Sequence, residues 1–322
     1  MLRVQFIREH QKAVLEGLQK RNLPNAEEII AQVLNADETR RKFQIELENV
    51  SEESNKLSKK IGMLFKTGEV QKANLAKQST VHLKEQKETL GKQKVGAEKK
   101  LQNLLYQIPN IPHTSVPEGN SEEDNEEIFS YGEIPKLSKN ALPHWDLAKK
   151  YDIIDFELGN KITGAGFPVY KGKGARLQRA LINYFLDKNT AAGYKEVQVP
   201  HLVNEASGIG TGSLPDKEGQ MYYVEMDDLY LIPTAEVPVT NIFRNDLVKE
   251  KDFPFALTAY TPCFRREAGS YGAHVRGLNR LHQFDKVEIV RVEHPDHSYD
   301  ALEGMIGHVK GILEELKLPY RI

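Results

Sequence analysis

Apolar residues recur along the first hundred positions with the spacing of two helical seams. The first seam alternates steps of four and three, with polar interruptions at Arg40 and Ser54, and comprises Ile29, Val33, Ala36, Arg40, Phe43, Leu47, Val50, Ser54, Leu57, Ile61 and Leu64. The second seam repeats every seventh residue and comprises Ala76, Leu83, Leu90, Ala97 and Leu104. Thr67 and Gly68 interrupt the pattern between the seams, so the sequence predicts an antiparallel helical hairpin. A helix of nearly forty residues spans about 60 Å, so we expect a projecting coiled-coil arm.

The second half of the chain carries short segments with the alternation of β-strands. These segments are residues 196–203, 221–225, 228–233, 255–264 and 286–292, and residues 175–189 have helical periodicity instead. Closely spaced strands favour an antiparallel sheet over a doubly wound one, and no glycine-rich phosphate loop opens a helix. The sequence therefore predicts an α+β protein with three parts. Residues 1–108 form the helical arm domain, 109–130 an acidic, proline-rich linker, and 131–322 a sheet domain flanked by helices.

The amino-acid composition excludes some kinds of site and indicates a compartment. The chain has 322 residues, with 44 basic and 46 acidic side chains, and a single cysteine, Cys263. One cysteine excludes an internal disulfide and a cysteine-built zinc site, and suits a reducing compartment. No segment resembles a signal peptide or reaches 18 consecutive apolar residues. We expect a cytoplasmic protein without membrane association.

Charge is distributed unevenly along the chain. Residues 1–108 carry 20 Lys and Arg against 14 Asp and Glu, a net charge of about +6, whereas 118–129 carry six acids and no base. A basic arm can bind a polyanion, and its candidate phosphate-binding lysines are Lys56, Lys59, Lys60, Lys84 and Lys87. Few aromatic residues lie among them, which favours recognition of folded RNA by shape and backbone. The alternatives are a solvated charged face and a coiled coil that only dimerises.

The stretch "CFRREAGSYGAHVRGLNRLHQFDKVEI", residues 263–289, combines four arginines, three glycines and a closing glutamate. Its "FRRE", loop and "RLHQFDKVEI" resemble motif 2 of the class II aminoacyl-tRNA synthetases. "GYKEVQVPHLV", residues 193–203, resembles their motif 1, which usually forms a dimer interface. "PTAEVPVTN", residues 233–241, with "TPCFRREAGSYG" and the helical hairpin, resembles the bacterial seryl-tRNA synthetases over essentially the whole chain.

The resemblance implies an enzyme that activates L-serine with ATP and transfers it from seryl-adenylate to tRNA(Ser), and also to tRNA(Sec). It implies ATP and Mg²⁺ as cofactors, a homodimer formed through residues 193–203, and tRNA binding by the arm. A non-catalytic tRNA-binding or coiled-coil protein is the alternative. No Gly-x-Gly-x-x-Arg-like motif 3 occurs in the last forty residues. We therefore expect a catalytic domain that is incomplete at its C-terminus, without metal ligands in this portion.

The same resemblance assigns roles to individual residues. Arg265 would clamp the α-phosphate of ATP with its bidentate fork, and Arg280 would lie near the reacting carboxylate and phosphate. The ATP-binding set is Arg265, Arg266, Glu267, Leu281 and Phe284. The serine-binding set is Thr234, Ala235, Glu236, Arg265 and Glu288, in which Glu288 takes the amino group and Glu236 the hydroxyl. Arg276, in a loop with Gly272 and Gly277, would meet the tRNA acceptor end.

Strand alternation adds a structural expectation to these roles. It places Arg280, His282, Phe284, Lys286 and Glu288 on one face of the returning strand. His282 is interpreted as a structural histidine, because no second histidine or acid cluster has the spacing of a zinc site.

Overall fold

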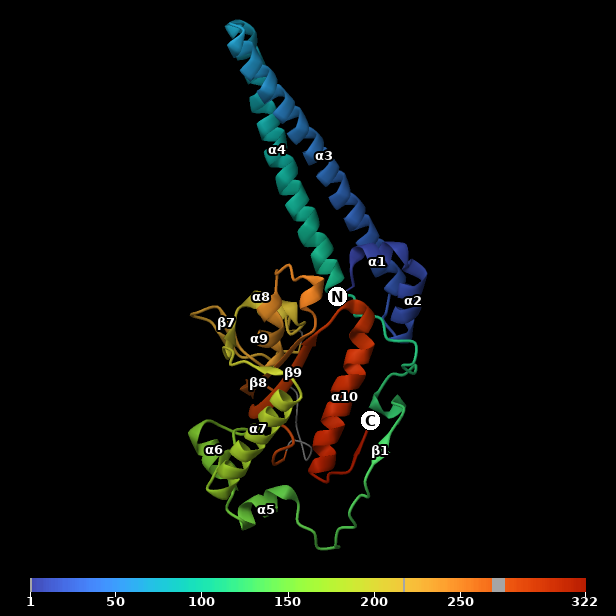
Figure 1. Cartoon of the computed structure of the whole chain (residues 1–322), viewed down its shortest axis with the longest axis vertical. Coiled ribbons are helices and arrows are strands. Elements are labelled where there is room, and N and C mark those ends of the chain that lie inside the picture. The colour runs from blue at the N-terminus through green and yellow to red at the C-terminus, as the bar shows by residue number, and fades with distance from the viewer. Residues whose placement is uncertain (1, 217, 268–275) are drawn as a thin grey trace. The chain divides into compact units, whose positions relative to one another are not determined.

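The computed structural model describes residues 2–216, 218–267 and 276–322 of the chain. They form two compact units, Met1–Ile128 and Phe129–Ile322 (Figure 1). Each unit has its own hydrophobic core.

The first unit is a small helical base that continues into a long hairpin. Helices α1 (Val4–Glu9) and α2 (Gln11–Lys20) pack on α3 (Ala26–Lys66) and α4 (Val70–Leu105). The core of the base comprises Ile7, Val14, Leu18, Ala26, Ile30, Val33, Ala36, Leu101, Leu104, Leu105 and Ile108. Apolar residues from all four helices meet there, and this burial holds the base of the hairpin together.

The predicted arm is confirmed. Helices α3 and α4, of 41 and 36 residues, lie side by side along the hairpin and join at residues 67–69 (Figure 1). Gly68 makes the turn with a φ of 76°, a left-handed conformation that glycine adopts without a steric cost. Ile61 and Leu83 are buried in the arm, as the seams predict, and Ala73, which lies outside the predicted seams, is buried as well. At 1.5 Å per residue, α3 is about 60 Å long.

A buried carboxylate ties α1 to α3 in the base. Asp37 is almost fully buried, and it forms ion pairs of 2.8 Å with Arg8, 2.9 Å with Arg40 and 3.0 Å with Arg41. Burial alone would raise the pKa of Asp37, but the hydrogen bond and charge of Arg40, with Arg41 and Arg8, lower it below its usual value. The carboxylate therefore stays ionised, and it stabilises the fold until the pH falls below about 4.

The segment after α4 is tethered to the base of the first unit. The side chains of Lys20, Arg21 and Asn22 donate hydrogen bonds to the backbone carbonyls of Thr114, Asn110 and Gly119. A single 3-10 turn, Glu122–Asp124, lies in the acidic stretch.

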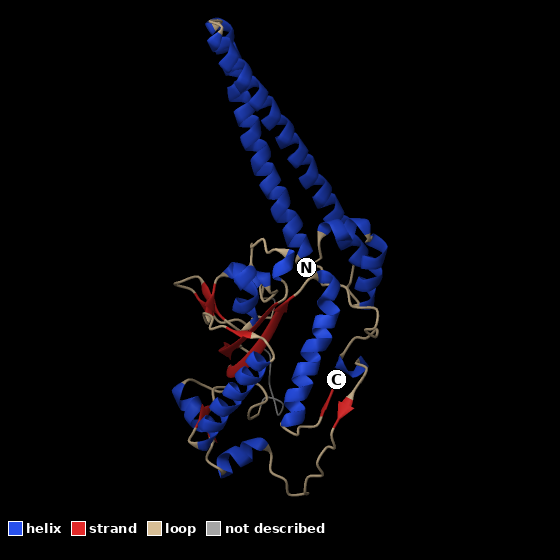
Figure 2. Cartoon of the chain, in the orientation of Figure 1, coloured by secondary structure: helices blue, strands red, loops and turns tan. Residues whose placement is uncertain are grey.

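The second unit is built on a three-stranded sheet in the order β4-β8-β9 (Figure 2). Strands β8 (Phe255–Phe264) and β9 (Gln283–Val292) pair antiparallel over ten residues each. Strand β4 (Lys195–Glu196) pairs with β8 in parallel, at one edge of the sheet. Helix α7 (Lys173–Ala191), which contains the predicted helix, packs against β8 and β9.

The segment 196–203 forms two strand ends instead of the single strand expected. Strand β5 (Leu202–Val203) belongs to a second sheet, in the order β5-β7-β6, with β7 (Leu229–Leu231) and β6 (Tyr223–Val224). Pro200, which has no N–H to donate to a ladder, lies between β4 and β5. The chain therefore leaves one sheet and enters the other at this proline.

The remaining elements surround these sheets. The strand pairs are β1 (Ser130–Tyr131) with β10 (Tyr320–Arg321) and β2 (Ile154–Asp155) with β3 (Val169–Tyr170). The helices are α5 (His144–Lys150), α6 (Phe156–Ile162), α8 (Glu205–Gly210), α9 (Glu236–Thr240) and α10 (Ser298–Glu315), with 3-10 turns at Asn241–Phe243, Glu250–Asp252 and Pro295–His297. Within the described ranges, no helix is long and apolar enough to span a bilayer.

Candidate active site

Strand β9 presents alternate side chains to the two faces of the sheet. Phe284, Lys286 and Glu288 share one face, and their partners across the ladder are Cys263, Thr261 and Ala259 of β8. These three β8 residues lie on the same face and are fully buried. Burial raises the pKa of the Cys263 thiol, against the hydrogen bond of Thr261 and the charge of Lys286, so the thiol stays protonated.

A compact polar cluster occupies one end of the face. The hydroxyl of Thr234 donates to Oε2 of Glu288 at 2.9 Å and accepts from Nζ of Lys286 at 3.1 Å. The same Lys286 Nζ lies 2.5 Å from Glu288 Oε2. The backbone N–H of Glu236 also donates to the Thr234 hydroxyl, at 3.2 Å. A carboxylate and a hydroxyl thus converge on one ammonium group, that of Lys286.

The segment 234–236 lies between strand β7 and helix α9 and contains the first residue of that helix. Ala235, just before the helix, is fully buried. Glu236, its first residue, has an exposed side chain. The predicted serine-binding residues Thr234, Ala235, Glu236 and Glu288 are therefore brought together by the contact between α9 and β9.

Arg265 and Phe284 meet at the other end of the face. The Arg265 guanidinium lies 5.1 Å from the centroid of the Phe284 ring, within cation–π range. Its Nε donates to the backbone carbonyl of Pro233 at 3.4 Å. The contacts described for this side chain hold the guanidinium by Nε and by the ring, so its Nη atoms have no hydrogen-bond partner among the described residues.

Glu267, after β8, and Arg280, before β9, form an ion pair. Nη1 of Arg280 lies 2.8 Å from Oε2 of Glu267, and Arg280 is 57% exposed while Glu267 is 11% exposed. The expectation that Arg280 lies on the returning strand is wrong, because β9 begins at Gln283. His282 explains the late start, since its N–H donates to Gly166 instead of to β8.

Other predicted residues lie close in sequence to this ion pair. Leu281 is buried, and the Arg266 guanidinium lies 5.9 Å from the Tyr222 ring centroid. The Arg276 guanidinium lies 5.0 Å from the Trp145 ring centroid, so it contacts α5 and not the cluster around Glu288. Gly272 lies outside the described residues.

His282 also has a structural environment on this side of the molecule. Its Nδ1 is 2.7 Å from the Tyr222 hydroxyl, and its ring stacks on Phe167 at 5.3 Å. Across the described ranges, no group of three or more His, Cys, Asp or Glu side chains could hold a metal ion.

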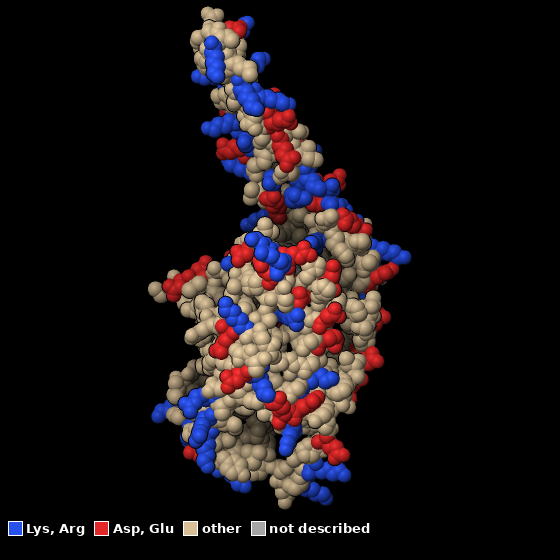
Figure 3. Space-filling model, in the orientation of Figure 1, with Lys and Arg blue, Asp and Glu red and all other residues tan. Residues whose placement is uncertain are grey.

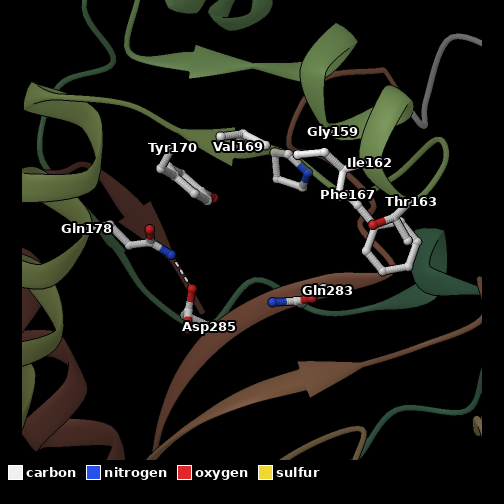
Figure 4. Close-up of a pocket in the computed structure, with 10 residues that line it drawn as sticks. Gly159, Ile162, Thr163, Phe167, Val169, Tyr170, Gln178, Gln283 and Asp285 are labelled. Carbon is white, nitrogen blue, oxygen red and sulfur yellow. Dashed lines mark hydrogen bonds between the residues drawn. The ribbon is translucent and has the colours of Figure 1, made fainter.

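The opposite face of β9 has a separate role. Gln283 and Asp285 line a pocket of about 270 Å³ together with Tyr170 and Gln178 (Figure 4). The Asp285 carboxylate accepts hydrogen bonds from Gln178 of α7 and, at 2.5 Å, from the Tyr260 hydroxyl. Burial, and then this hydrogen bond, raise the pKa of Tyr260, so the phenol stays protonated as a donor. These bonds fasten β9 to α7 and β8 behind the polar cluster.

The predicted phosphate-binding lysines lie on the outer surfaces of the arm. Lys56, Lys59 and Lys60 of α3 and Lys84 and Lys87 of α4 are all exposed. Lys56 pairs with Glu52 at 2.6 Å, one turn earlier in the helix. Basic and acidic side chains are interspersed along the visible face of the arm (Figure 3). The lysines are accessible, but they do not form a purely basic surface.

Comparisons with known protein families give matches in both units of the chain. Residues 1–112 match the family of the seryl-tRNA synthetase N-terminal domain, and residues 222–322 match the tRNA synthetase class II core domain (G, H, P, S and T). The whole chain is 45% identical to a serine–tRNA ligase of Salinibacter ruber and 44% identical to one of a Hydrogenobaculum species. It covers 75% and 76% of the lengths of these relatives. The chain belongs to the seryl-tRNA synthetase family. The predicted resemblance is thereby confirmed.

A solved seryl-tRNA synthetase supports the fold as well. The structure of the Pyrococcus horikoshii enzyme complexed with ATP matches the whole chain with a TM-score of 0.86 at 30% identity, and the chain covers 76% of it. The prediction of a helical hairpin followed by a class II synthetase domain is therefore confirmed. The alternative, a coiled-coil protein without a catalytic domain, is not supported, because residues 222–322 match the class II core.

Two features of the site were not predicted from the sequence of this seryl-tRNA synthetase. Lys286 was placed on the correct face, but its pairing with Thr234 and Glu288 was not foreseen. Its two-residue spacing from Glu288 on an alternating strand was a usable signal. The buried hydrogen bond between Asn189 and Thr258 was also missed, and no local pattern indicates it.

Proposed function

We propose that this seryl-tRNA synthetase activates L-serine with ATP and transfers the seryl group to tRNA(Ser), using the face of β9 that carries Phe284, Lys286 and Glu288. The observation that carries the proposal is the convergence of Thr234, Lys286 and Glu288 at one end of that face, with Arg265 at the other. A cluster for an ammonium group and a guanidinium fork whose Nη atoms have no hydrogen-bond partner among the described residues are the two sites that serine and a phosphate require.

Serine would bind by its amino group to Glu288 and Thr234. The substrate ammonium would take hydrogen bonds that Lys286 makes in the ligand-free cluster, at 2.5 Å to Glu288 and 3.1 Å to Thr234. The exposed carboxylate of Glu236, at the first position of α9, would accept from the serine hydroxyl. A site that binds a hydroxyl in this way rejects an analogue without one, because its polar groups would be left unpaired.

ATP would bind with its α-phosphate at Arg265, in reach of the serine carboxylate. Two parallel N–H groups of the guanidinium match two phosphate oxygens and stabilise the extra negative charge of the transition state. Phe284 would stack on adenine, with Arg266 and Leu281 beside the nucleotide. Glu267 has one carboxylate oxygen paired with Arg280, so its other oxygen is the acceptor for the adenine amino group. The ATP complex of the Pyrococcus horikoshii relative supports nucleotide binding.

The described residues contain no group of three or more His, Cys, Asp or Glu side chains that could hold a metal ion, and Mg²⁺ is proposed on the predicted resemblance alone. The charge of the phosphates in this part of the site is met by Arg265 and its neighbours.

Serine-dependent exchange of pyrophosphate into ATP tests the proposed function. We expect exchange with serine and a kcat/KM for alanine that is lower by about 10⁴-fold, as for sites that bind a substrate hydroxyl. Threonine, which keeps the hydroxyl but adds a methyl group, separates hydroxyl recognition from pocket size. Exchange with alanine within tenfold of that with serine would contradict the assignment of Glu236.

The arm would bind tRNA(Ser) through phosphate contacts of its exposed lysines. The supporting observations are a hairpin about 60 Å long and five exposed lysines on its outer surfaces, on both helices. Recognition by shape fits this surface, because few aromatic side chains are available for base stacking. We extend the proposal to tRNA(Sec) and to dimerisation through residues 193–203, both on the predicted resemblance. We extend it also to a cytoplasmic location, because a single cysteine suits a reducing compartment.

Replacing Lys56, Lys59 and Lys60 together with alanine should weaken binding of tRNA(Ser) at least tenfold at about 0.1 M salt. Each lost phosphate contact should also reduce the salt slope of binding by about one. Filter binding or fluorescence anisotropy over a salt series measures both quantities. The matched control replaces the exposed Lys136, Lys139 and Lys161 of the second unit. An unchanged slope in the arm variant, or an equal loss in the control, would contradict phosphate binding by these lysines.

A further inference from the structure

A chain of buried and partly buried hydrogen bonds leads from α10 to the backbone of Glu288. His308 Nε2 of α10 lies 2.7 Å from Oδ1 of Asn189 on α7, and Nδ2 of Asn189 donates to the Thr258 hydroxyl of β8 at 2.9 Å. That hydroxyl donates to the main-chain carbonyl of Glu288 at 2.9 Å. Residues from four elements, up to 119 positions apart in sequence, therefore form one continuous chain.

The chemistry of the groups fixes the direction of this chain. The amide oxygen of Asn189 can only accept, so the facing Nε2 of His308 is the donor. The amide nitrogen can only donate, so it uses a lone pair of the Thr258 oxygen and leaves the hydroxyl proton for the Glu288 carbonyl. Because each member satisfies the next, rotation of any one amide or hydroxyl would leave another group without its partner.

Burial makes the arrangement selective. Asn189 is 4% exposed and Thr258 is fully buried, so water cannot replace a lost partner. Leucine and valine would fill these positions at similar size, and the packing of α7 on the sheet does not itself need polar groups. The polar groups therefore specify where α7, β8 and β9 lie relative to one another at Glu288.

The hydrogen bond from Thr258 holds strand β9 at a residue of the candidate site. The Thr258 hydroxyl adds a fixed bond at the residue whose side chain contacts Thr234 and Lys286 on the site face. A shift of the Glu288 backbone by a fraction of an ångström would move its carboxylate by a similar amount.

We propose that Asn189 and Thr258, with His308 behind them, are positioning residues that set the Glu288 carboxylate for the serine ammonium. They touch no substrate and act through the main chain of Glu288. The proposal rests on the proposed function of Glu288 as the serine-binding acid. It assigns the three residues to serine binding and not to ATP binding, because Arg265 is fixed separately, by Pro233 and Phe284.

The test is a Thr258→Val variant, which removes the hydroxyl at constant shape, compared with Thr258→Ser, which retains it. Pyrophosphate exchange gives the KM values for serine and ATP, and thermal unfolding reports stability. We expect Thr258→Val to raise the KM for serine about tenfold and to leave the KM for ATP within twofold. Thr258→Ser should restore the serine KM to within threefold of the parent. Asn189→Leu should resemble Thr258→Val, and the double variant should add little, since both cut one chain.

Thr190→Val is the matched control, because Thr190 lies beside Asn189 on α7 and its hydroxyl, as far as the described residues show, bonds within the helix, to the carbonyls of Leu186 and Asp187. His308→Phe keeps the ring contact with Tyr194 and loses the outer bond, so it gives a second measurement if Thr258→Val does not fold. It should raise the serine KM about threefold.

If both KM values rose equally, or if the serine KM stayed unchanged while stability fell, these residues would have only a structural role. Failure of the proposed function has a different signature, because the parent protein would then show no exchange with serine at all.

Discussion

Replacing Glu288 with glutamine should lower kcat/KM for serine in pyrophosphate exchange by at least about 100-fold, while the KM for ATP stays within threefold. Glutamine keeps the shape of the side chain but cannot carry the negative charge that an ammonium group requires. Losing one partner of a desolvated charged hydrogen bond typically costs about 2–5 kcal/mol. Lys286 increases the loss, because its ammonium, 3.1 Å from the Thr234 hydroxyl, would remain beside the incoming serine without an anion to balance it.

Two further variants separate recognition of serine from general damage. Glu293→Gln removes a glutamate that is also ion-paired, with Arg291 at 2.8 Å, just beyond the end of β9, and it should leave exchange within twofold of the parent. Adding Lys286→Met to Glu288→Gln removes the unbalanced ammonium, so the double variant should be more active than the single one. A Glu288→Gln protein with near-normal serine KM would show that another group binds the amino group.

The sequence predicts the arm well because its seams depend on neighbours within one helix pair. The heptad positions from Phe43 to Leu64 describe a single continuous helix, and the break at Thr67 and Gly68 is the turn between α3 and α4. Strand β8, at residues 255–264, has the predicted bounds because it is paired along its whole length. In both cases a regular local pattern coincides with the packing that the element meets in the fold.

Prediction fails where a long-range partner decides the structure. Arg280 lies before β9 because His282 bonds to Gly166, more than a hundred positions earlier, and no alternation rule contains that contact. Pro200 divides the expected strand 196–203 between two sheets. Thr234 and Glu288 are 54 positions apart, so their hydrogen bond, and the place of Lys286 within it, became visible only in the folded chain. The face of β9 that carries Phe284, Lys286 and Glu288 was predicted, and the partners that order it were not.

The two ends of that face are held by different means, which separates their expected effects. At one end, Glu288 is fixed by hydrogen bonds to its carboxylate and its backbone. At the other, Arg265 is fixed by one carbonyl and an aromatic ring, with its Nη atoms free of described partners. Serine affinity should therefore depend on the first end, and the rate of the chemical step on the second.

Replacing Arg265 with lysine should lower kcat for pyrophosphate exchange by about 10²–10³-fold, with a smaller effect on the KM for serine. Lysine keeps the positive charge but not the planar fork, so it cannot hold two phosphate oxygens at once. It also loses the stacking of the guanidinium on Phe284, 5.1 Å away, which aims the fork. Loss of one donor that stabilises transition-state charge costs about 2.7–4 kcal/mol, which corresponds to this fall in kcat.

Arg265→Ala should be less active than Arg265→Lys, because it removes the charge as well as the fork. The relative activities of the two variants distinguish geometry from charge. Equal activities would mean that only the fork matters. A nearly active lysine variant would mean that only the charge matters. Arg179→Lys is the matched control, since Arg179 is an exposed residue of α7, and it should leave kcat unchanged. Single-turnover measurement of adenylate formation places the loss in the chemical step. An Arg265→Lys protein that forms adenylate within fivefold of the parent would contradict a bidentate phosphate clamp at this position.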